Sequence, residues 1–142
     1  MATLTKEIQQ LSDTLRGVEV LMLASVAVNG HLSSRPLVLQ EVDADGTMWF
    51  FIGRSSGLAD DLRGNPQVVV SYAYALDTNY IAVSGKATLV EDRARTSALW
   101  RAEYLTWFPL GITDPELALI RIDVLSAEHW LDGAHLHLAV PR

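Results

Sequence analysis

The chain contains no cysteine in its 142 residues. Disulfide bonds, zinc–thiolate sites, iron–sulfur clusters and a cysteine nucleophile are therefore excluded. Positive charge is scarce too, because 11 Lys and Arg residues stand against 17 Asp and Glu residues, for a formal net charge of -6. This balance repels a phosphate backbone, so we expect no nucleic-acid partner.

Long apolar runs are also lacking. The longest, Val20–Val28, is interrupted by Ser25 and is too short to span a bilayer. The opening residues, MATLTKEIQQLSDTL, lack the apolar stretch of a signal peptide. We therefore expect a cytoplasmic protein with no membrane partner. The chain does have 49% hydrophobic residues, enough for one packed domain over residues 1–142.

The spacing of apolar residues predicts an N-terminal helix followed by strands. Within residues 1–17, apolar residues at i, i+4, i+7 and i+11 share one helical face: Leu4, Ile8, Leu11 and Leu15. Asn29-Gly30 is a strong hairpin signal between two β-like segments. The expected strands cover residues 18–28, 31–42, 47–52, 67–75, 80–90 and 117–125, and residues 127–133 complete the β part.

Two further segments have helical character. Residues 53–66 predict a short helix capped by Ser55 or Ser56, and Glu91 to about Phe108 predicts a longer one. The tail, residues 134–142, fits either a last short strand or a loose terminus. Because the strands follow one another mostly by hairpins, we expect a mainly β (α+β) fold: a closed antiparallel barrel of six or seven strands with flanking helices.

The segment Gly53–Gly57 satisfies the G-x-S-x-G pattern between an expected strand and an expected helix. In a serine hydrolase this pattern holds the nucleophile, here Ser55, with Asp132 and His135 following in the order of a catalytic triad. That elbow belongs to a parallel α/β sheet, whereas this chain reads as a series of hairpins.

The same loop suits a phosphate. A small-residue loop that opens a helix presents free backbone N–H groups and the positive end of the helix dipole. Ser55 and Ser56 can add hydroxyl donors, and Gly57 allows close approach of the backbone. The alternative is a helix cap without a ligand.

Arg35 is a second candidate for the same anion. If residues 31–42 pair with residues 47–52, the Arg35 guanidinium lies beside the loop. Gln40 is five residues further on, so on a regular strand it points to the opposite face. A shared ligand therefore requires a bulge or bend, for which Pro36 is a suitable place. The alternative is an exposed arginine on an edge strand.

Three histidines lie near the C-terminus. His135 and His137 could place two imidazoles on one face of a strand, with His129 nearby, as a metal site. No carboxylate spacing supports such a site, and a solvent-facing tail is the alternative. We therefore predict no metal.

From Val18 to Gly133 the sequence resembles the general stress protein branch of the pyridoxamine-phosphate-oxidase-like flavoproteins. The resemblance depends on the order and spacing of SRPLVLQEVDADGTMWFFIGRSS, LRGNPQVVVSYA, YIAVSGKATLVEDRA and DPELALIRIDVLSAEHWLDG. It implies an FMN-binding split β-barrel that forms a homodimer, with the flavin in clefts at the dimer interface.

The resemblance also implies site residues. It places Arg35 at the flavin phosphate, and it places Gln40 near the polar edge of the ring or the ribityl chain. The residues expected beside the ring are Pro36, Leu37 and Val38, those bordering the phosphate and ribityl chain are Ile52, Gly53, Ser55, Ser56 and Leu58, and those approaching from the partner subunit are Tyr80 and Trp130. Trp100 and Trp107 match aromatic positions that either cover the cleft or pack.

The chain departs from the family pattern in two places. Ile52-Gly53 stands where relatives often have threonine-serine, and Leu58 stands where they usually have lysine. The implied phosphate site is therefore short of one cation and one hydroxyl donor, and Arg54 is the candidate replacement cation.

The implied function is that of an FMN-dependent oxidoreductase of unknown substrate with a small-molecule redox partner. FAD or another flavin is the alternative cofactor. The alternative functions are a non-enzymatic flavin or nucleotide binder that acts in stress response, and the serine hydrolase using Ser55. The sequence identifies no general acid or base.

Overall fold

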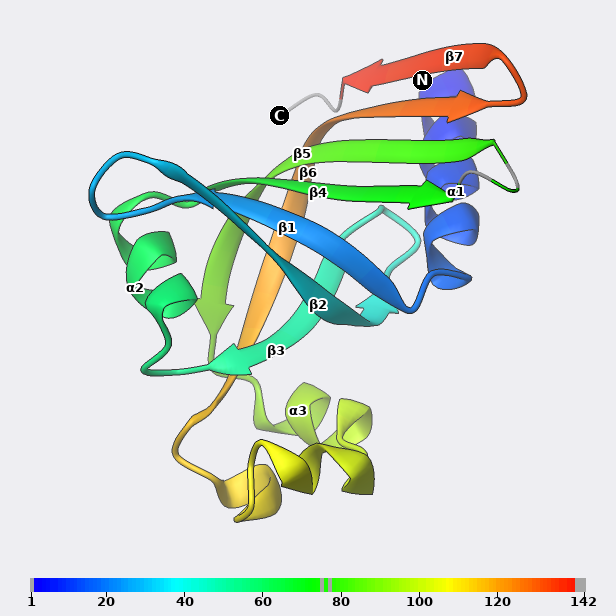
Figure 1. Ribbon diagram of the computed structural model, residues 1–142. Coiled ribbons are helices and arrows are strands. Elements are labelled where there is room, and N and C mark those ends of the chain that lie inside the picture. Colours follow the sequence, from blue (N-terminus) through cyan, green and yellow to red (C-terminus); the bar gives the residue numbers. More distant parts are fainter. Residues whose placement is uncertain (1, 75, 77, 140–142) are drawn as a thin grey trace.

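The computed structural model describes residues 2–74, 76 and 78–139, with side chains from residue 6 onward (Figure 1). Its strands are β1 (Val20–Val26), β2 (Leu32–Val42), β3 (Met48–Gly53), β4 (Gln67–Tyr74), β5 (Asn79–Val90), β6 (Leu117–Leu131) and β7 (Ala134–Ala139). They pair in the order β3-β2-β1-β4-β5-β6-β7, and β3 also pairs with β6. Six antiparallel strands therefore close into a barrel, which confirms the predicted mainly β fold.

β6 belongs to both the barrel and the extra hairpin. Its first half pairs with β3, from Leu117 to Ile122, and its second half pairs with β7, from Ser126 to Leu131. The C-terminal tail is thus a strand as far as Ala139, and residues 140–142 lie outside the described part. Asp132 and Gly133, with φ of 50° and 84°, form the two-residue turn that joins β6 to β7.

Helices cover the ends of the barrel (Figure 1). They are α1 (Ala2–Arg16), α2 (Gly57–Gly64), α3 (Arg93–Leu99) and two 3-10 turns (Ala102–Thr106 and Gly111–Thr113). The predicted N-terminal helix is confirmed: Leu11 and Leu15 are buried, while the side chain of Leu4 lies outside the described part. No helix in the described ranges is long and apolar enough to cross a membrane.

The core lies inside the barrel. Along β1, Leu21 and Leu23 point inward and are buried, whereas Val20 and Met22 point outward and are partly exposed. The largest buried side chains of the other strands include Phe50, Val70, Ile81, Val83, Ile120 and Ile122. Burial of each such side chain stabilises the folded state by about 1.5–3 kcal/mol.

The predicted helix from Glu91 to Phe108 is wrong. α3 ends at Leu99, Trp100 is extended with φ of -64° and ψ of 138°, and only a 3-10 turn follows. The break lets the rings of Trp100 and Tyr104 both pack edge-on against Phe51 of β3, at centroid distances of 6.5 and 6.0 Å. Tertiary packing of aromatic side chains has therefore overridden the local helical pattern.

Candidate functional site

A cleft opens where β2 and β3 separate. The two strands pair from Val42↔Met48 to Leu39↔Phe50, with a register shift between Leu39 and Glu41. Beyond that point β2 continues along β1, while β3 continues along β6 as far as Gly53. The two strands leave between them a cleft of ≈ 560 Å³, within the range of roughly 300–1,000 Å³ usual for small-molecule sites.

Nine residues that the sequence predicted for the flavin site line this one cleft. They are Arg35, Pro36, Leu37, Val38, Gln40, Ile52, Gly53, Ser56 and Leu58. Sequence reasoning missed Phe51, Tyr104, Phe108 and Glu116, which complete the lining together with Trp107. The cleft thus brings the predicted residues together, and their role in holding a flavin stays a prediction.

Arg35 is positioned by hydroxyl groups at the polar end of the cleft. Its Nη1 donates to Ser25 Oγ at 2.9 Å and to the Leu23 carbonyl at 3.2 Å, and its Nη2 donates to Ser33 Oγ at 3.0 Å. Ser25 is buried, so one side of the guanidinium is fixed. Nε–H and one Nη2–H have no partner among the described residues and remain able to bind an anion.

A bulge brings Gln40 to the same cleft as Arg35. The hypothesis of a shared ligand requires such an irregularity and locates it at Pro36. In the structure, however, Pro36 pairs regularly with Met22. The register shift occurs at Gln40 itself, between Leu39 and Glu41. The extra residue turns Gln40 toward the cleft, where its Oε1 accepts a 3.0 Å hydrogen bond from the Tyr104 hydroxyl.

The Ser/Gly loop keeps its hydroxyl groups occupied. Ser56 is the N-cap of α2: its Oγ donates to the Gly53 carbonyl at 2.7 Å and accepts from the Ala59 N–H at 3.2 Å. Ser55, which does not line the cleft, donates its hydroxyl to Glu116 Oε2 at 2.6 Å. In this state neither hydroxyl is the free phosphate donor that the sequence predicted.

Arg54 does not provide the replacement cation. Its Nη1 forms a 2.8 Å ion pair with Glu91, and its Nε and Nη2 donate to the carbonyls of Pro115 and Leu117. These contacts hold the guanidinium away from the cleft, whose lining does not include it. Arg35 is therefore the one cation that lines the cleft within the described part of the chain.

Aromatic rings form the apolar wall of the cleft. Phe51 and Tyr104 contact each other edge-on, and Phe108 is buried beside them. Trp107 lies at the mouth with 67% of its surface exposed, so it covers the cleft only loosely. Trp100 packs on the far side of this group and does not line the cleft.

Tyr80 and Trp130 lie together but outside the cleft. They are direct partners across β5 and β6, and the Trp130 ring stacks on His135 with centroids 5.0 Å apart. Trp130 is 37% exposed, so this pair forms part of the outer surface. Its predicted approach to the flavin from a partner subunit is not tested by one chain.

The proposed hydrolase triad is not assembled. Ser55 contacts Glu116, which directly precedes β6, whereas His135 pairs with Trp130 at the other end of that strand. Asp132 Oδ1 instead accepts a 2.6 Å hydrogen bond from Thr78. The length of β6 therefore separates the nucleophile from its required base.

The histidines also form no metal site. His135 and His137 are partners of Trp130 and Glu128, while His129 is the partner of Leu136 and so lies on the opposite face of the hairpin. Within the described residues no group of three or more His, Asp or Glu could hold a metal ion.

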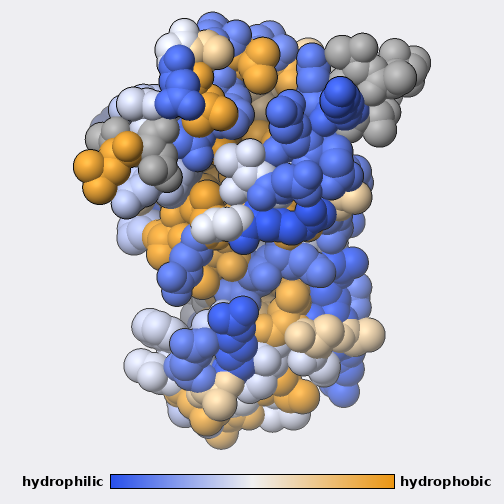
Figure 2. Space-filling model, turned by 90° about the vertical axis from the view of Figure 1, so that its right-hand side faces the viewer, coloured by the Kyte–Doolittle hydropathy of each residue, from blue (hydrophilic) through white to orange (hydrophobic). Residues whose placement is uncertain are grey.

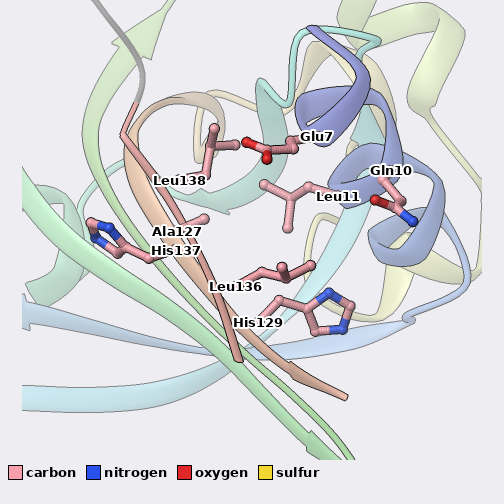
Figure 3. A pocket seen from close by; sticks show the side chains of 8 residues that line it. All are labelled: Glu7, Gln10, Leu11, Ala127, His129, Leu136, His137 and Leu138. Carbon is pink, nitrogen blue, oxygen red and sulfur yellow. The ribbon is translucent and has the colours of Figure 1, made fainter. Parts of the chain in front are cut away.

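His129 borders a small cavity between α1 and the β6–β7 hairpin (Figure 3). The cavity has a volume of ≈ 30 Å³, too small for anything beyond water. The His129 Nε2 lies 2.7 Å from Asn79 Oδ1. Burial here lowers the pKa of His129 below its ordinary value, because the charged imidazolium loses hydration.

A closed antiparallel barrel with a cleft where β2 and β3 part defines a split-barrel protein. Residues 6–140 match the profile of the family described as pyridoxamine 5'-phosphate oxidase like, and the chain belongs to that family.

Similar solved structures agree with this assignment. General stress protein 26 of Bacillus anthracis is 26% identical, with a TM-score of 0.77, over 95% of this chain and 98% of that one. The general stress FMN/FAD binding protein of Xanthomonas citri is 28% identical, with a TM-score of 0.74, over 96% of each chain. A relative found by sequence, protein bli-3 of Neurospora crassa, is 24% identical over 116 residues, which are 75% of this chain and 56% of bli-3. The chain thus spans little more than half the length of that relative.

Proposed function

We propose that this protein binds a flavin, FMN, in the cleft between β2 and β3 and uses it as an oxidoreductase with a small-molecule redox partner. The observation that carries the proposal is the position of Arg35 in the lining of an apolar cleft, with two N–H groups that have no partner among the described residues. The likeness to the FMN/FAD binding protein of Xanthomonas citri supports a flavin as the ligand.

The residues present fit a flavin phosphate at one end of the cleft and an apolar ring at the other. Arg35 would hold the phosphate with its two free N–H groups, beside the first backbone N–H groups of α2, those of Gly57 and Leu58. Pro36–Val38 would lie along the ring, and Gln40 would hydrogen-bond its polar edge. The bound flavin would supply the redox chemistry, while these residues bind and orient it.

We also propose a homodimer with the cleft at its interface. One group of outward-facing apolar residues of the barrel is partly exposed: Val20, Met22, Val38 and Val69. They come together because Val20 pairs with Val38 on neighbouring strands, and β4 lies on the other side of β1. An apolar face of this kind is typical of a protein–protein contact, and Tyr80 and Trp130 of the partner subunit would complete the site.

A second apolar surface lies beside the mouth of the cleft. Figure 2 shows apolar side chains at the lower end of the molecule, where α3 and the 3-10 turns are found. The exposed apolar residues of this segment are Leu105, Trp107, Leu110 and Ile112. Because Trp107 also lines the cleft, a partner that covers this surface would close the cleft to water.

The absorbance spectrum of the freshly purified protein tests flavin binding, and a titration of flavin-free protein with FMN measures the affinity. Flavin absorbance in the blue that stays with the protein on gel filtration is expected. If neither a bound chromophore nor quenching of FMN fluorescence is found, the proposed ligand is wrong.

A non-enzymatic flavin binder is the second candidate. One observation favours it: among the described residues that line the cleft, Glu116 is the one carboxylate, and neither histidine nor lysine is present. The cleft thus offers few groups for proton transfer. Anaerobic mixing with NADH or NADPH separates the two functions, because bleaching of the bound flavin supports the oxidoreductase and a persistent yellow colour supports the binder. The cytoplasmic location stays a prediction.

A further inference from the structure

Glu116 places a carboxylate at the polar end of the cleft. Its Oε2 accepts two hydrogen bonds from Ser55, one from the backbone N–H at 3.2 Å and one from the hydroxyl at 2.6 Å. A backbone N–H and a hydroxyl are the donors that commonly hold a phosphate oxygen. The chain's own carboxylate therefore occupies two donors of this loop that could otherwise bind an anionic group.

This position of Glu116 is fixed by its backbone. The Glu116 N–H donates to Asp114 Oδ1 at 2.9 Å, and its carbonyl accepts from the Arg54 N–H at 2.7 Å. The carboxylate lies beside Gly53, since a Cβ at that position would be in ordinary contact with Glu116 Oε2 at 3.7 Å. The side chain thus reaches Ser55 from an anchored residue.

The charges in the cleft are balanced before any ligand binds. Arg35 and Glu116 are the one cationic and the one carboxylate side chain among the described residues that line it. A phosphate monoester carries close to two negative charges at neutral pH. The guanidinium alone leaves part of that charge uncompensated, and the carboxylate adds repulsion.

We propose that Glu116 is a specificity-determining residue that lowers the affinity of the cleft for phosphorylated flavins relative to unphosphorylated ones. The inference rests on the proposed flavin-binding function. The phosphate of FMN, held by Arg35 and the N–H groups of Gly57 and Leu58, would lie in the same cleft as the Glu116 carboxylate and would be repelled by it. Riboflavin ends in a neutral hydroxyl group, so it lacks this repulsion.

The test measures the dissociation constants of FMN and riboflavin by quenching of flavin fluorescence, with the full chain. Glu116→Gln removes the charge and keeps an oxygen that accepts from Ser55. Its matched control is Glu103→Gln, which removes an exposed carboxylate that does not line the cleft. We expect Glu116→Gln to tighten FMN binding about three- to tenfold, with riboflavin binding unchanged and both ligands unaffected by Glu103→Gln.

Three results would overturn the inference. They are an FMN dissociation constant unchanged by Glu116→Gln, an equal change for FMN and riboflavin, and an equal gain for FMN in the control. Riboflavin binding in each variant also reports that the cleft is folded. If the wild-type protein binds neither flavin, the proposed function itself fails and this inference fails with it.

Discussion

The Tyr104 hydroxyl donates a 3.0 Å hydrogen bond to Gln40 Oε1 and so ties the 3-10 turn after α3 to the bulge in β2. Tyr104 is buried, and its ring packs edge-on against Phe51. The bond lies where the ladder between β2 and β3 ends. A side-chain contact therefore holds the walls of the cleft at the point where backbone pairing stops.

Replacing Tyr104 with phenylalanine removes this bond and keeps the ring. We expect the free energy of unfolding of the flavin-free protein to fall by about 0.5–1.5 kcal/mol, the net value of one hydrogen bond. Urea unfolding followed by tryptophan fluorescence measures the change.

The matched control is Tyr72→Phe. Tyr72 packs partly buried against the core, and its hydroxyl has no hydrogen-bond partner among the described residues. Its removal should leave the unfolding free energy unchanged. An equal loss in both variants would show that the bond to Gln40 contributes nothing specific.

The order of strands could be predicted from the sequence because its signals are local. Alternating burial along β1 and the turn at Asn29-Gly30, with φ of 86° at Gly30, depend on neighbouring residues only. The end of α3 could not be predicted in this way, because Trp100 leaves the helix to pack against Phe51. The tail alone does not distinguish strand β7 from a loose terminus, although Asp132-Gly133 before it is itself a hairpin signal.

The same difference between local signals and long-range contacts applies to the residues of the candidate site. Arg35 and the loop before α2 were found because their chemistry is visible in short segments. Glu116 and Tyr104 were missed because they contact Ser55 and Gln40 across 61 and 64 residues. Only the closure of the barrel brings β6 and the 3-10 turn to the cleft, and no local pattern indicates that.

Replacing Arg35 with methionine should weaken FMN binding roughly 10- to 100-fold, because a charge-assisted hydrogen bond contributes about 1.5–3 kcal/mol. Riboflavin, which lacks the phosphate, should lose much less affinity. Fluorescence titration with both ligands measures the difference. Arg93→Met is the control, since Arg93 is exposed and makes no ion pair with the described residues. If Arg35→Met weakens the binding of FMN and riboflavin equally, a phosphate-binding role of Arg35 is contradicted.

Gly85 is required by close packing of β5 against β6. A Cβ at this position would lie 2.7 Å from Ile122 Cγ2 and 2.8 Å from the Asp123 carbonyl oxygen. Since the backbone there cannot retreat easily, we expect Gly85→Ala to lower the unfolding free energy by about 1–3 kcal/mol. Chemical denaturation measures this loss. At Gly64 the added Cβ would have no atom within 4 Å apart from its chain neighbours and the backbone of its own helix, so Gly64→Ala should leave the unfolding free energy unchanged or slightly raised.

His129 predicts a pH dependence of stability. Its pKa is lowered in the folded protein by burial, so the unfolded chain takes up a proton first as the pH falls through 6.5. The unfolding free energy therefore falls between about pH 6.5 and the pKa of His129 in the folded protein. At pH values below that pKa, His129 causes no further loss. Glu7 and His137 line the same cavity (Figure 3). Asn79 Oδ1 lies 2.7 Å from His129 Nε2.

His129→Gln removes this titration and keeps a group that can donate to Asn79. Unfolding free energies measured between pH 7.5 and 5 should fall less steeply in the variant than in the wild-type protein. Parallel curves would mean that His129 is not responsible for any loss in that range.

The proposed dimer predicts that a charge on the apolar face of β1 separates the subunits and releases the flavin. Met22 is 42% exposed at the centre of that face, between Pro36 of β2 and Ser71 of β4. We expect Met22→Glu to sediment as a monomer and to bind FMN much more weakly, because burying an unpaired carboxylate in an interface is unfavourable. Val28→Glu makes the same change of charge on a residue that is 83% exposed beyond the end of β1, and it should stay dimeric with flavin bound. A Met22→Glu monomer that retains full affinity for FMN would show that one subunit suffices for the site, because the partner's Tyr80 and Trp130 could then contribute nothing to it.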